Sequence, residues 1–177
     1  PAFTKITGLE GIYQNLDYLP RAWFVNNIDN VKDQKASLNK LMDISFRPKE
    51  KAILVGYDGP ILDENGDGYI ESIDLKTNTV KINCYSKGGS LLILSEVYYN
   101  PGWRCKINGE DTKIYQANHV LRSVYVPDGK HEVVFYYDNS KWQTARFTSR
   151  ASFFLATFFC LFLIYRERKS ILKLKNY

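Results

Sequence analysis

Alternation of hydrophobic and polar positions dominates the middle of the chain. Between residues 51 and 138, short runs rich in Val, Ile and Tyr recur roughly every 8–12 residues, which is typical of an antiparallel β-sandwich. Turn-forming sequences such as Lys87-Gly-Gly89 and Asn108-Gly109 separate the runs. The predicted strands are Lys51–Tyr57, Tyr69–Leu75, Thr79–Ser86, Ser90–Tyr99, Trp103–Asn108, Thr112–Ala117, His119–Val126 and Lys130–Asp138.

One helix is predicted upstream of these strands. Leu38, Leu41 and Met42 are spaced i, i+3, i+4, which favours a helix over about Asp33–Met42. We therefore expect residues 1–50 to form a strand/helix segment that packs on a β-domain of residues 51–145. The predicted fold class is mainly β: a jelly-roll-like antiparallel β-sandwich with one short N-terminal helix and a C-terminal transmembrane helix.

A continuous hydrophobic run near the end of the chain predicts that membrane helix. Ala151–Tyr165 has no charged residue and holds five of the ten Phe. Counted from Phe147, the helix would rise about 28 Å against a hydrocarbon core of roughly 30 Å, provided that Arg150 extends to the interface. Trp142 and Tyr165 flank the run as interfacial aromatics do. The prediction is a transmembrane helix over residues 147–165; the alternative is a buried C-terminal helix of a soluble protein.

The positive charge of the chain is concentrated after this run. The formal net charge is +5, and the tail of residues 166–177 holds five basic side chains and one acidic one, so little excess remains elsewhere. A nucleic-acid-binding domain carries its charge on a folded face, so we expect no nucleic-acid partner. By the positive-inside rule the tail is cytoplasmic and the β-domain extracytoplasmic.

Cys84 and Cys105 are predicted to be free thiols. If Thr79–Ser86, Ser90–Tyr99 and Trp103–Asn108 form a meander, the two cysteines flank one central strand, about 9.6 Å apart. A disulfide needs Cα atoms within roughly 7 Å. A bridge would require the two strands to lie in facing sheets.

The segment from Asp63 to Asp74 resembles a calcium-binding loop of the EF-hand or dockerin type. Asp63, Asn65, Asp67 and Asp74 take ligand positions 1, 3, 5 and 12, with glycine at position 6. However, position 12 is Asp where an EF-hand has Glu, and neither flank has a helical pattern. The alternative is a polar hairpin loop. We expect no cofactor, with calcium at this loop as the other possibility.

No catalytic motif is visible, because the sequence has no nucleophile elbow, phosphate-binding glycine loop or zinc signature. Aromatic and polar residues nevertheless concentrate in one part of the predicted sandwich. There Arg122 could bind a phosphate or carboxylate, and aromatic rings could stack on a sugar. The alternative is structural, with Arg122 satisfying turn carbonyls and Trp103 filling the core. The candidate ligand-binding residues are Tyr98, Tyr99, Trp103, Asn118 and Arg122.

Two longer stretches resemble the YfhO-like bacterial membrane proteins. Ile12–Val25 is similar to their Y-x-N-x-x-x-L-P-R-A-x-x-V segment, and Leu91–Arg104 to their L-L-V-L-S-E-x-Y-Y-P-G-W strand and turn. Shorter matches, the apolar helix and the basic tail follow in the same order. The chain departs from the family by an Asn before Pro101 and by the acidic Asp63–Asp67 loop.

The resemblance implies a polytopic parent protein similar to GT-C-type glycosyltransferases, which use lipid-linked sugars on cell-envelope polymers. Their catalytic acid lies in an N-terminal membrane region, so the chain would supply no catalytic residue. Because Pro1 is not an initiator, we expect a piece of a longer chain: its extracytoplasmic accessory domain and last membrane helix. The implied partners are membrane lipid, a polyprenyl-linked sugar or envelope polymer, and the N-terminal membrane region. The alternatives are a membrane-tethered adhesion or carbohydrate-binding module and, less favoured, a free-standing hydrolase.

Overall fold

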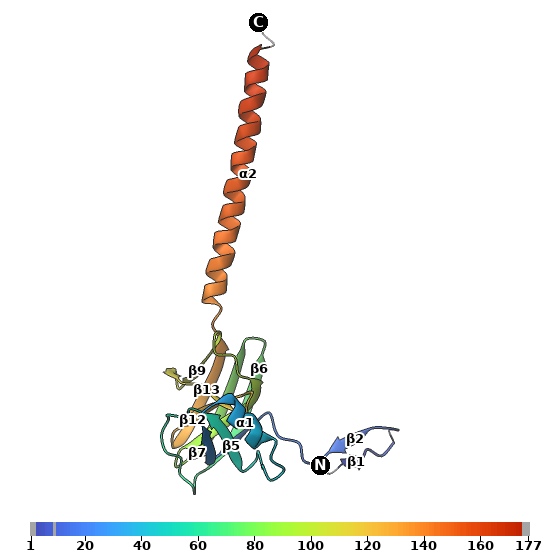
Figure 1. Cartoon of the computed structure of the whole chain (residues 1–177), viewed down its shortest axis with the longest axis vertical. Helices are drawn as coiled ribbons and strands as arrows, with labels where there is room; N and C mark the ends of the chain where they lie inside the picture. The colour runs from blue at the N-terminus through green and yellow to red at the C-terminus, as the bar shows by residue number, and fades with distance from the viewer. Residues whose placement is uncertain (1–2, 9, 175–177) are drawn as a thin grey trace. The chain divides into compact units, whose positions relative to one another are not determined.

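The computed structural model describes residues 3–8 and 10–174, with side chains described up to residue 169. The chain divides after Tyr137 into two compact units. The elements in chain order are β1 (Phe3–Lys5), β2 (Tyr13–Asn15), β3 (Ala22–Val25), β4 (Asn27–Val31), α1 (Gln34–Leu41), β5 (Lys51–Val55), β6 (Asp67–Lys76), β7 (Thr79–Lys87), β8 (Ser90–Val97), β9 (Trp103–Ile107), β10 (Glu110–Thr112), β11 (Tyr115–Ala117), β12 (Leu121–Val126), β13 (Gly129–Tyr137) and α2 (Ser140–Leu174) (Figure 1).

The first unit is mostly β, as predicted from the alternating pattern. A five-stranded sheet has the order β10-β9-β13-β7-β6, and a six-stranded sheet has the order β3-β8-β12-β11-β5-β4. The strand pairs are antiparallel except for β4 and β5, which run parallel. β1 and β2 form a separate two-stranded sheet. The predicted sandwich is therefore confirmed.

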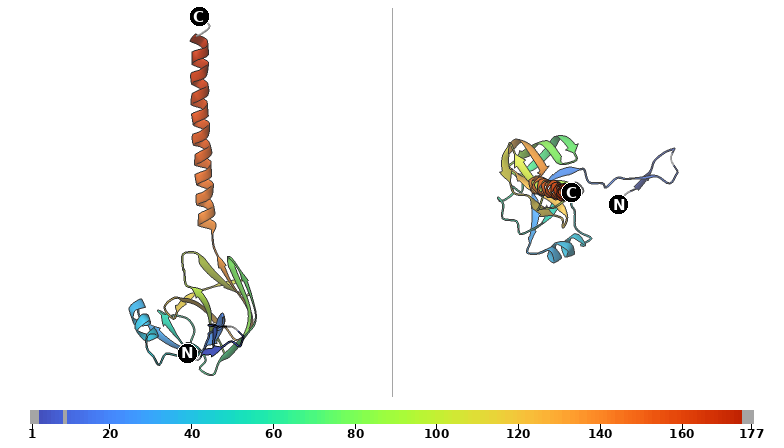
Figure 2. Two further views of the ribbon diagram at one scale, coloured as in Figure 1. Left: turned by 90° about the vertical axis from the view of Figure 1, so that its right-hand side faces the viewer. Right: turned by 90° about the horizontal axis from the view of Figure 1, so that it is seen from above.

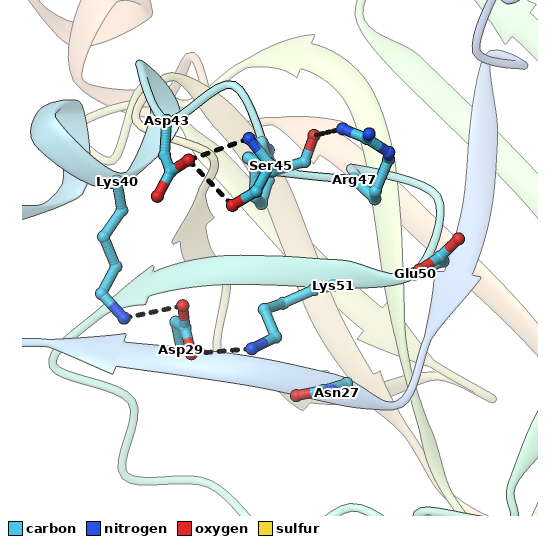
Figure 3. Close-up of a pocket in the computed structure, with 9 residues that line it drawn as sticks. Asn27, Asp29, Lys40, Asp43, Ser45, Arg47, Glu50 and Lys51 are labelled. Carbon is cyan, nitrogen blue, oxygen red and sulfur yellow. Dashed lines mark hydrogen bonds and ion pairs between the residues drawn. The ribbon is translucent and has the colours of Figure 1, made fainter.

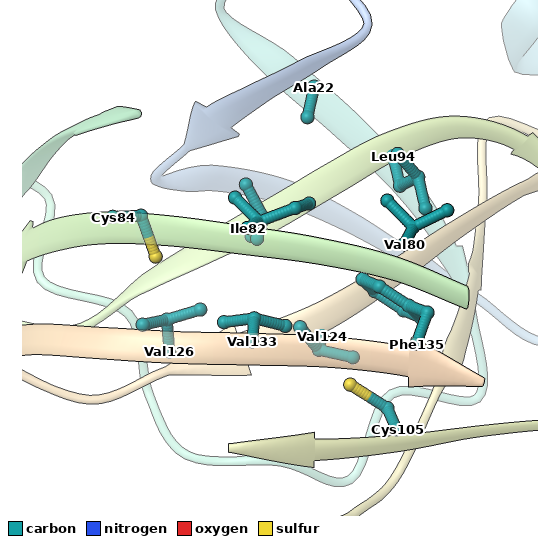
Figure 4. Packing of buried hydrophobic residues seen from close by; sticks show 11 residues of the cluster. Ala22, Val80, Ile82, Cys84, Leu94, Cys105, Val124, Val126, Val133 and Phe135 are labelled. Atoms are coloured by element: carbon teal, nitrogen blue, oxygen red, sulfur yellow. The ribbon is translucent and has the colours of Figure 1, made fainter. Parts of the chain in front are cut away.

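Alternate residues of both sheets form the core between them. Val133 and Phe135 of β13 pack with Val124 and Val126 of β12 and with the inward side chains of β7 and β8 (Figure 4). Arg122 of β12 is also buried, and its spacing of two and four residues from these valines places it on the same face of the strand.

The six-stranded sheet curls on itself. β3 and β4 lie at opposite ends of its strand order, yet Asn26 alone separates them in the chain. A flat sheet of six strands would hold its edges about 24 Å apart, whereas two consecutive peptide links span at most about 7 Å. The curl encloses a second apolar cluster with members such as Trp23, Leu54 and Ile93.

The helix α1 confirms the predicted helix but not its predicted buried face. Asp33 caps its N-terminus by accepting a hydrogen bond from the backbone N–H of Ala36 at 2.8 Å. Ser37 is its buried residue, whereas Leu38 and Met42 are exposed at 41% and 77%. α1 lies beside the strands and contacts β4 and β5 (Figure 2).

Residues 1–50 contribute more to the sheet than the pattern predicted. β3 and β4 are strands of the six-stranded sheet. The hydrophobic pattern did not predict them, because each is only four or five residues long. β3 is almost entirely buried, so its sequence does not alternate between apolar and polar positions. The domain boundary expected at residue 50 therefore falls inside one hydrogen-bonded sheet.

The two cysteines are free and buried, as predicted, but the predicted meander is wrong. β13, and not β8, lies between β7 and β9. Cys84 of β7 pairs with His131 of β13, and Cys105 of β9 pairs with Phe135 of β13. The two cysteines are therefore separated by four residues along β13, about 13 Å, as well as by two strand spacings. β8 belongs to the other sheet, since the tight Lys87-Gly-Gly89 turn leads the chain across the sandwich.

The second unit contains the helix α2. It is continuous from Ser140 to Leu174, and Ser140–Lys169 is long and apolar enough to cross a membrane. This segment includes the predicted span of residues 147–165. The first residues of the predicted basic tail continue the helix, while residues 175–177 lie outside the described residues.

Candidate functional site

A hollow of about 200 Å³ opens where β8, β9 and β10 end or begin. Its lining combines two aromatic rings, two cations and three smaller side chains: Tyr98, Trp103, Arg104, Lys113, Asn100, Thr112 and Ile114. No carboxylate is among these lining residues. Aromatic faces beside hydrogen-bond donors are the usual means by which proteins hold sugars.

The turn between β8 and β9 sets the position of Trp103. The backbone N–H of Trp103 donates to the carbonyl of Tyr99 at 3.2 Å, which closes the turn around Pro101. Gly102 is required there, because a Cβ atom would lie 2.1 Å from the ring of Tyr137. That ring meets the indole edge to face, with centroids 5.8 Å apart.

The two cations at the hollow are held differently. Arg104 donates through Nη1 to the carbonyl of Asn100 at 3.0 Å. Lys113 forms an ion pair with Asp58 through contacts of 2.6 and 2.7 Å from Nζ to the carboxylate oxygens. The hydrogen bond with Asp58 raises the pKa of Lys113, and Lys113 in turn lowers the pKa of Asp58. Lys113 is therefore charged at neutral pH.

Arg122 lies behind Trp103 and is buried, with a side chain only 2% exposed. Its guanidinium carbon is 3.8 Å from the centroid of the indole ring. Nε donates to the carbonyl of Val97 at 3.0 Å and Nη2 to Glu96 at 3.4 Å, while the buried Nη1 has no hydrogen-bond partner. Burial lowers the pKa of Arg122 to about 10, so the guanidinium stays charged at neutral pH.

Glu96 joins two arginines at this end of the sandwich. One carboxylate oxygen contacts Arg122, and the other accepts from Arg21, which directly precedes β3. One carboxylate thus faces two cations, and the proximity of Arg21 also lowers the pKa of Arg122. The cluster carries a net positive charge beneath the indole.

The structure brings together part of the predicted ligand set. Tyr98 and Trp103 line the hollow, and Arg122 supports Trp103 without lining it. The side chain of Tyr99 is 52% exposed and is not part of the lining. The sequence analysis did not predict that Arg104 and Lys113 line the hollow. A sequence does not show that the pairing of β10 with β9 brings residue 113 beside β9.

Asn118 has a structural role in this arrangement. Its side-chain oxygen accepts from the backbone N–H of Ile53 at 2.9 Å, and its own N–H donates to the carbonyl of Ile53 at 2.8 Å. It adopts a left-handed conformation with φ of 46°, which asparagine tolerates better than most residues. Asn118 therefore joins the β11–β12 turn to β5.

The four residues of the suggested calcium loop are not brought together. Asp67 and Asp74 both lie in β6, and seven residues of extended strand separate them by about 23 Å. Asp63 accepts from the backbone N–H of Asn65 at 3.0 Å, as in an ordinary polar turn. Among the residues that the structure describes, no group of three or more His, Cys, Asp or Glu side chains could hold a metal ion.

Other hollows adjoin β4. One of about 240 Å³ is polar, and three of its charged groups, Asp29, Lys40 and Lys51, are paired with one another (Figure 3). Asp29 contacts Lys40 at 2.7 Å and Lys51 at 3.2 Å, and these contacts lower its pKa. A hollow of about 660 Å³ shares Asn27 and Glu50 with the first. These ion pairs connect α1, β4 and β5. The charged lining of the first hollow therefore has a structural role.

Comparison with known proteins identifies a family for part of the chain. Residues 69–149 match the model of the family described as bacterial membrane protein YfhO. The matched segment runs from β6 to the beginning of α2 and includes Trp103 and Arg122. The predicted resemblance is confirmed over this segment. Neither the curated proteins nor the solved structures contain a match to the chain.

Proposed function

Because residues 69–149 carry the sequence of the YfhO bacterial membrane protein family, we propose that the chain is the C-terminal part of a polytopic glycosyltransferase. It supplies an extracytoplasmic accessory domain and the last membrane helix of an enzyme that transfers lipid-linked sugar to a cell-envelope polymer. The chain itself is non-catalytic and contributes binding. Its partners are membrane lipid and the N-terminal membrane region of the parent protein.

The observation that carries this proposal is the extent of the family match. It includes the strands β7 to β13 and continues into the helix that can cross a membrane. The match therefore joins most of the β-domain to the first ten residues of that helix, Ser140–Ser149. A helix that crosses the membrane tethers the β-domain to the bilayer in which a lipid-linked sugar is presented.

The orientation follows from the charge pattern. Three basic residues, Arg166, Arg168 and Lys169, follow the apolar segment of α2 directly. Cytoplasmic flanks of membrane helices are enriched in such residues. The β-domain therefore lies on the extracytoplasmic side, where envelope polymers are modified.

The hollow beside Trp103 supports a binding role for the β-domain. Trp103 and Tyr98 offer faces for stacking on a pyranose ring, and Arg104 offers N–H donors for its hydroxyl groups. Stacking on an aromatic ring is tolerant of sugar identity, which suits a domain that positions a donor or an acceptor. The hollow is small enough for a single sugar unit.

The test uses the full-length parent protein in its own membrane. We expect the double variant Tyr98→Ala and Trp103→Ala to reduce glycosylation of the envelope polymer at least about tenfold while the protein remains in the membrane. Tyr69→Ala is the control, because Tyr69 is an exposed tyrosine of β6 that stacks on Tyr85 and does not line the hollow. Unchanged glycosylation in the double variant would contradict the binding role.

Deletion of the parent gene separates this proposal from a membrane-tethered carbohydrate-binding module. A glycosyltransferase leaves the envelope polymer without its sugar when the gene is deleted. A tethered module leaves glycosylation intact and changes only sugar binding or adhesion at the cell surface.

A further inference from the structure

Burying the charged guanidinium of Arg122 costs free energy, and its few hydrogen bonds offset only part of that cost. A guanidinium has five N–H donors, but here Nη1 is buried without a partner and the contact to Glu96 is long, at 3.4 Å. Glu96 is itself shared with Arg21. Replacing a buried ion pair by apolar side chains of similar volume is often neutral or stabilising. Stability of the sandwich alone therefore does not account for an arginine at this position.

The contact that uses the shape of the guanidinium is the one with Trp103. The guanidinium carbon lies 3.8 Å from the indole centroid, within stacking distance, and 5.9 Å from the centroid of Phe135. Nε and Nη2 fix the guanidinium plane through the carbonyl of Val97 and through Glu96. Arg122 thus supports one face of the indole, and Tyr137 packs against the same ring in a T-shaped contact.

This support crosses the sandwich. Trp103 begins β9 of the five-stranded sheet, and Arg122 belongs to β12 of the six-stranded sheet. Trp103 lines the hollow and Arg122 does not. The guanidinium therefore reaches a ligand in the hollow only through the orientation of the indole.

We propose that Arg122 is a positioning residue that holds the indole of Trp103 as a fixed wall of the hollow. This inference rests on the proposed sugar-binding role of the hollow and assigns Arg122 a part in it. A fixed ring loses no rotational freedom when a sugar stacks on it, so binding is tighter than on a mobile ring. Glu96 and Val97 of β8 anchor the guanidinium and thereby set the ring plane.

The experiment measures the order of the indole directly. The full chain in detergent micelles is labelled with 5-fluorotryptophan, which gives one ¹⁹F signal for each of the three Trp residues. Trp103→Phe assigns the signal of residue 103. We expect that signal to be narrow in the unaltered chain and to broaden or split in Arg122→Met and in Arg122→Lys. Met keeps the volume without the planar cation, and Lys keeps the charge without the plane.

Lys106→Met is the matched control. Lys106, in β9, is another cation that lies over an aromatic ring, but its partner is Tyr136 at 5.9 Å. The signal of Trp103 should be unaffected by this change. If Arg122→Met does not fold, Glu96→Gln provides the second variant, because it weakens one anchor of the guanidinium without leaving a cavity. We expect a smaller broadening of the same signal.

The probe for binding is N-acetylglucosamine, followed by the shift of the Trp103 signal. We expect its apparent Kd to rise about fivefold or more in folded Arg122→Met. A narrow signal and an unchanged Kd in that variant would overturn the positioning role. No shift with this sugar in the unaltered chain would count against the sugar-binding role of the hollow, while the line width would still decide whether Arg122 orders the ring.

Discussion

At the scale of single residues, burial determines which groups can react. Desolvation raises the pKa of the Cys84 thiol to about 11 and raises that of Cys105 as well. Only the thiolate is nucleophilic, so both thiols should be inert near neutral pH. The two cysteines are therefore core residues of the sandwich, in agreement with their place beside Val133 and Phe135.

Thiol titration tests this interpretation. In a Cys160→Ser variant at about pH 8, we expect an aromatic disulfide reagent to modify neither remaining thiol at an appreciable rate in the folded chain, because both stay protonated and covered. After denaturation both should react within minutes. Rapid modification of either cysteine in the folded chain would contradict their burial.

Residue types were easier to predict than the contacts between residues. Tyr98, Trp103 and Arg122 stand out in the sequence because aromatic and basic residues are dense there. The stacking of Arg122 on Trp103 was not predictable, since it depends on β9 and β12 facing one another from different sheets. The role of Asn118 was equally hidden, because its partner Ile53 lies 65 residues away in the chain.

At the scale of elements, one carboxylate connects three of them. Asp29 of β4 contacts Lys40 of α1 and Lys51 of β5. The hydrogen bond from Lys40 is the largest cause of its lowered pKa. A carboxyl with a lower pKa in the folded chain stabilises the fold while ionised. Its contribution is therefore present above the unfolded pKa of about 4 and is lost as the pH falls through the folded pKa.

Acid unfolding tests this connection. We expect Asp29→Asn to lower the melting temperature near neutral pH and to make the decrease between about pH 5 and pH 3 less steep. Glu110→Gln, in the exposed hairpin between β9 and β10, is the control and should follow the unaltered chain. If the melting temperature of Asp29→Asn falls with pH as it does in the unaltered chain, the ion pairs contribute nothing to the stability of the fold.

The positions of two aspartates in β6 lead to a prediction about calcium. Because Asp67 and Asp74 are held far apart in one extended strand, we expect no rise in melting temperature with millimolar calcium. A clear rise that disappears in Asp67→Ala would mean that the loop rearranges to bind the ion. The sequence motif suggested a loop because it shows the spacing of oxygen ligands but not the pairing of β6 with β7.

The long, regular elements followed their sequence patterns closely. β7, β8 and β13 lie within two residues of their predicted bounds, because alternation over eight or nine residues is a clear signal. β3 and β4 are short, and their pairing depends on the curl of the sheet. No local pattern encodes that curl, since it arises when distant strands assemble.

At the scale of the whole molecule, the account joins a β-domain to a membrane helix. The family match covers residues 69–149, from β6 to the first residues of α2, and α2 has the length and composition of a membrane span. The β-domain must then lie on one defined side of the bilayer. The proposed function requires the extracytoplasmic side, because a cytoplasmic domain would not meet an envelope polymer.

Cysteine accessibility in intact cells measures this most directly. In the chain with Cys160→Ser, the buried Cys84 and Cys105 give little background. Glu110→Cys reports on the β9–β10 hairpin and Lys169→Cys on the far end of the candidate span. The account predicts that a membrane-impermeant maleimide labels residue 110 in intact cells and residue 169 only after the cells are opened. Labelling of residue 169 but not of residue 110 in intact cells would contradict it.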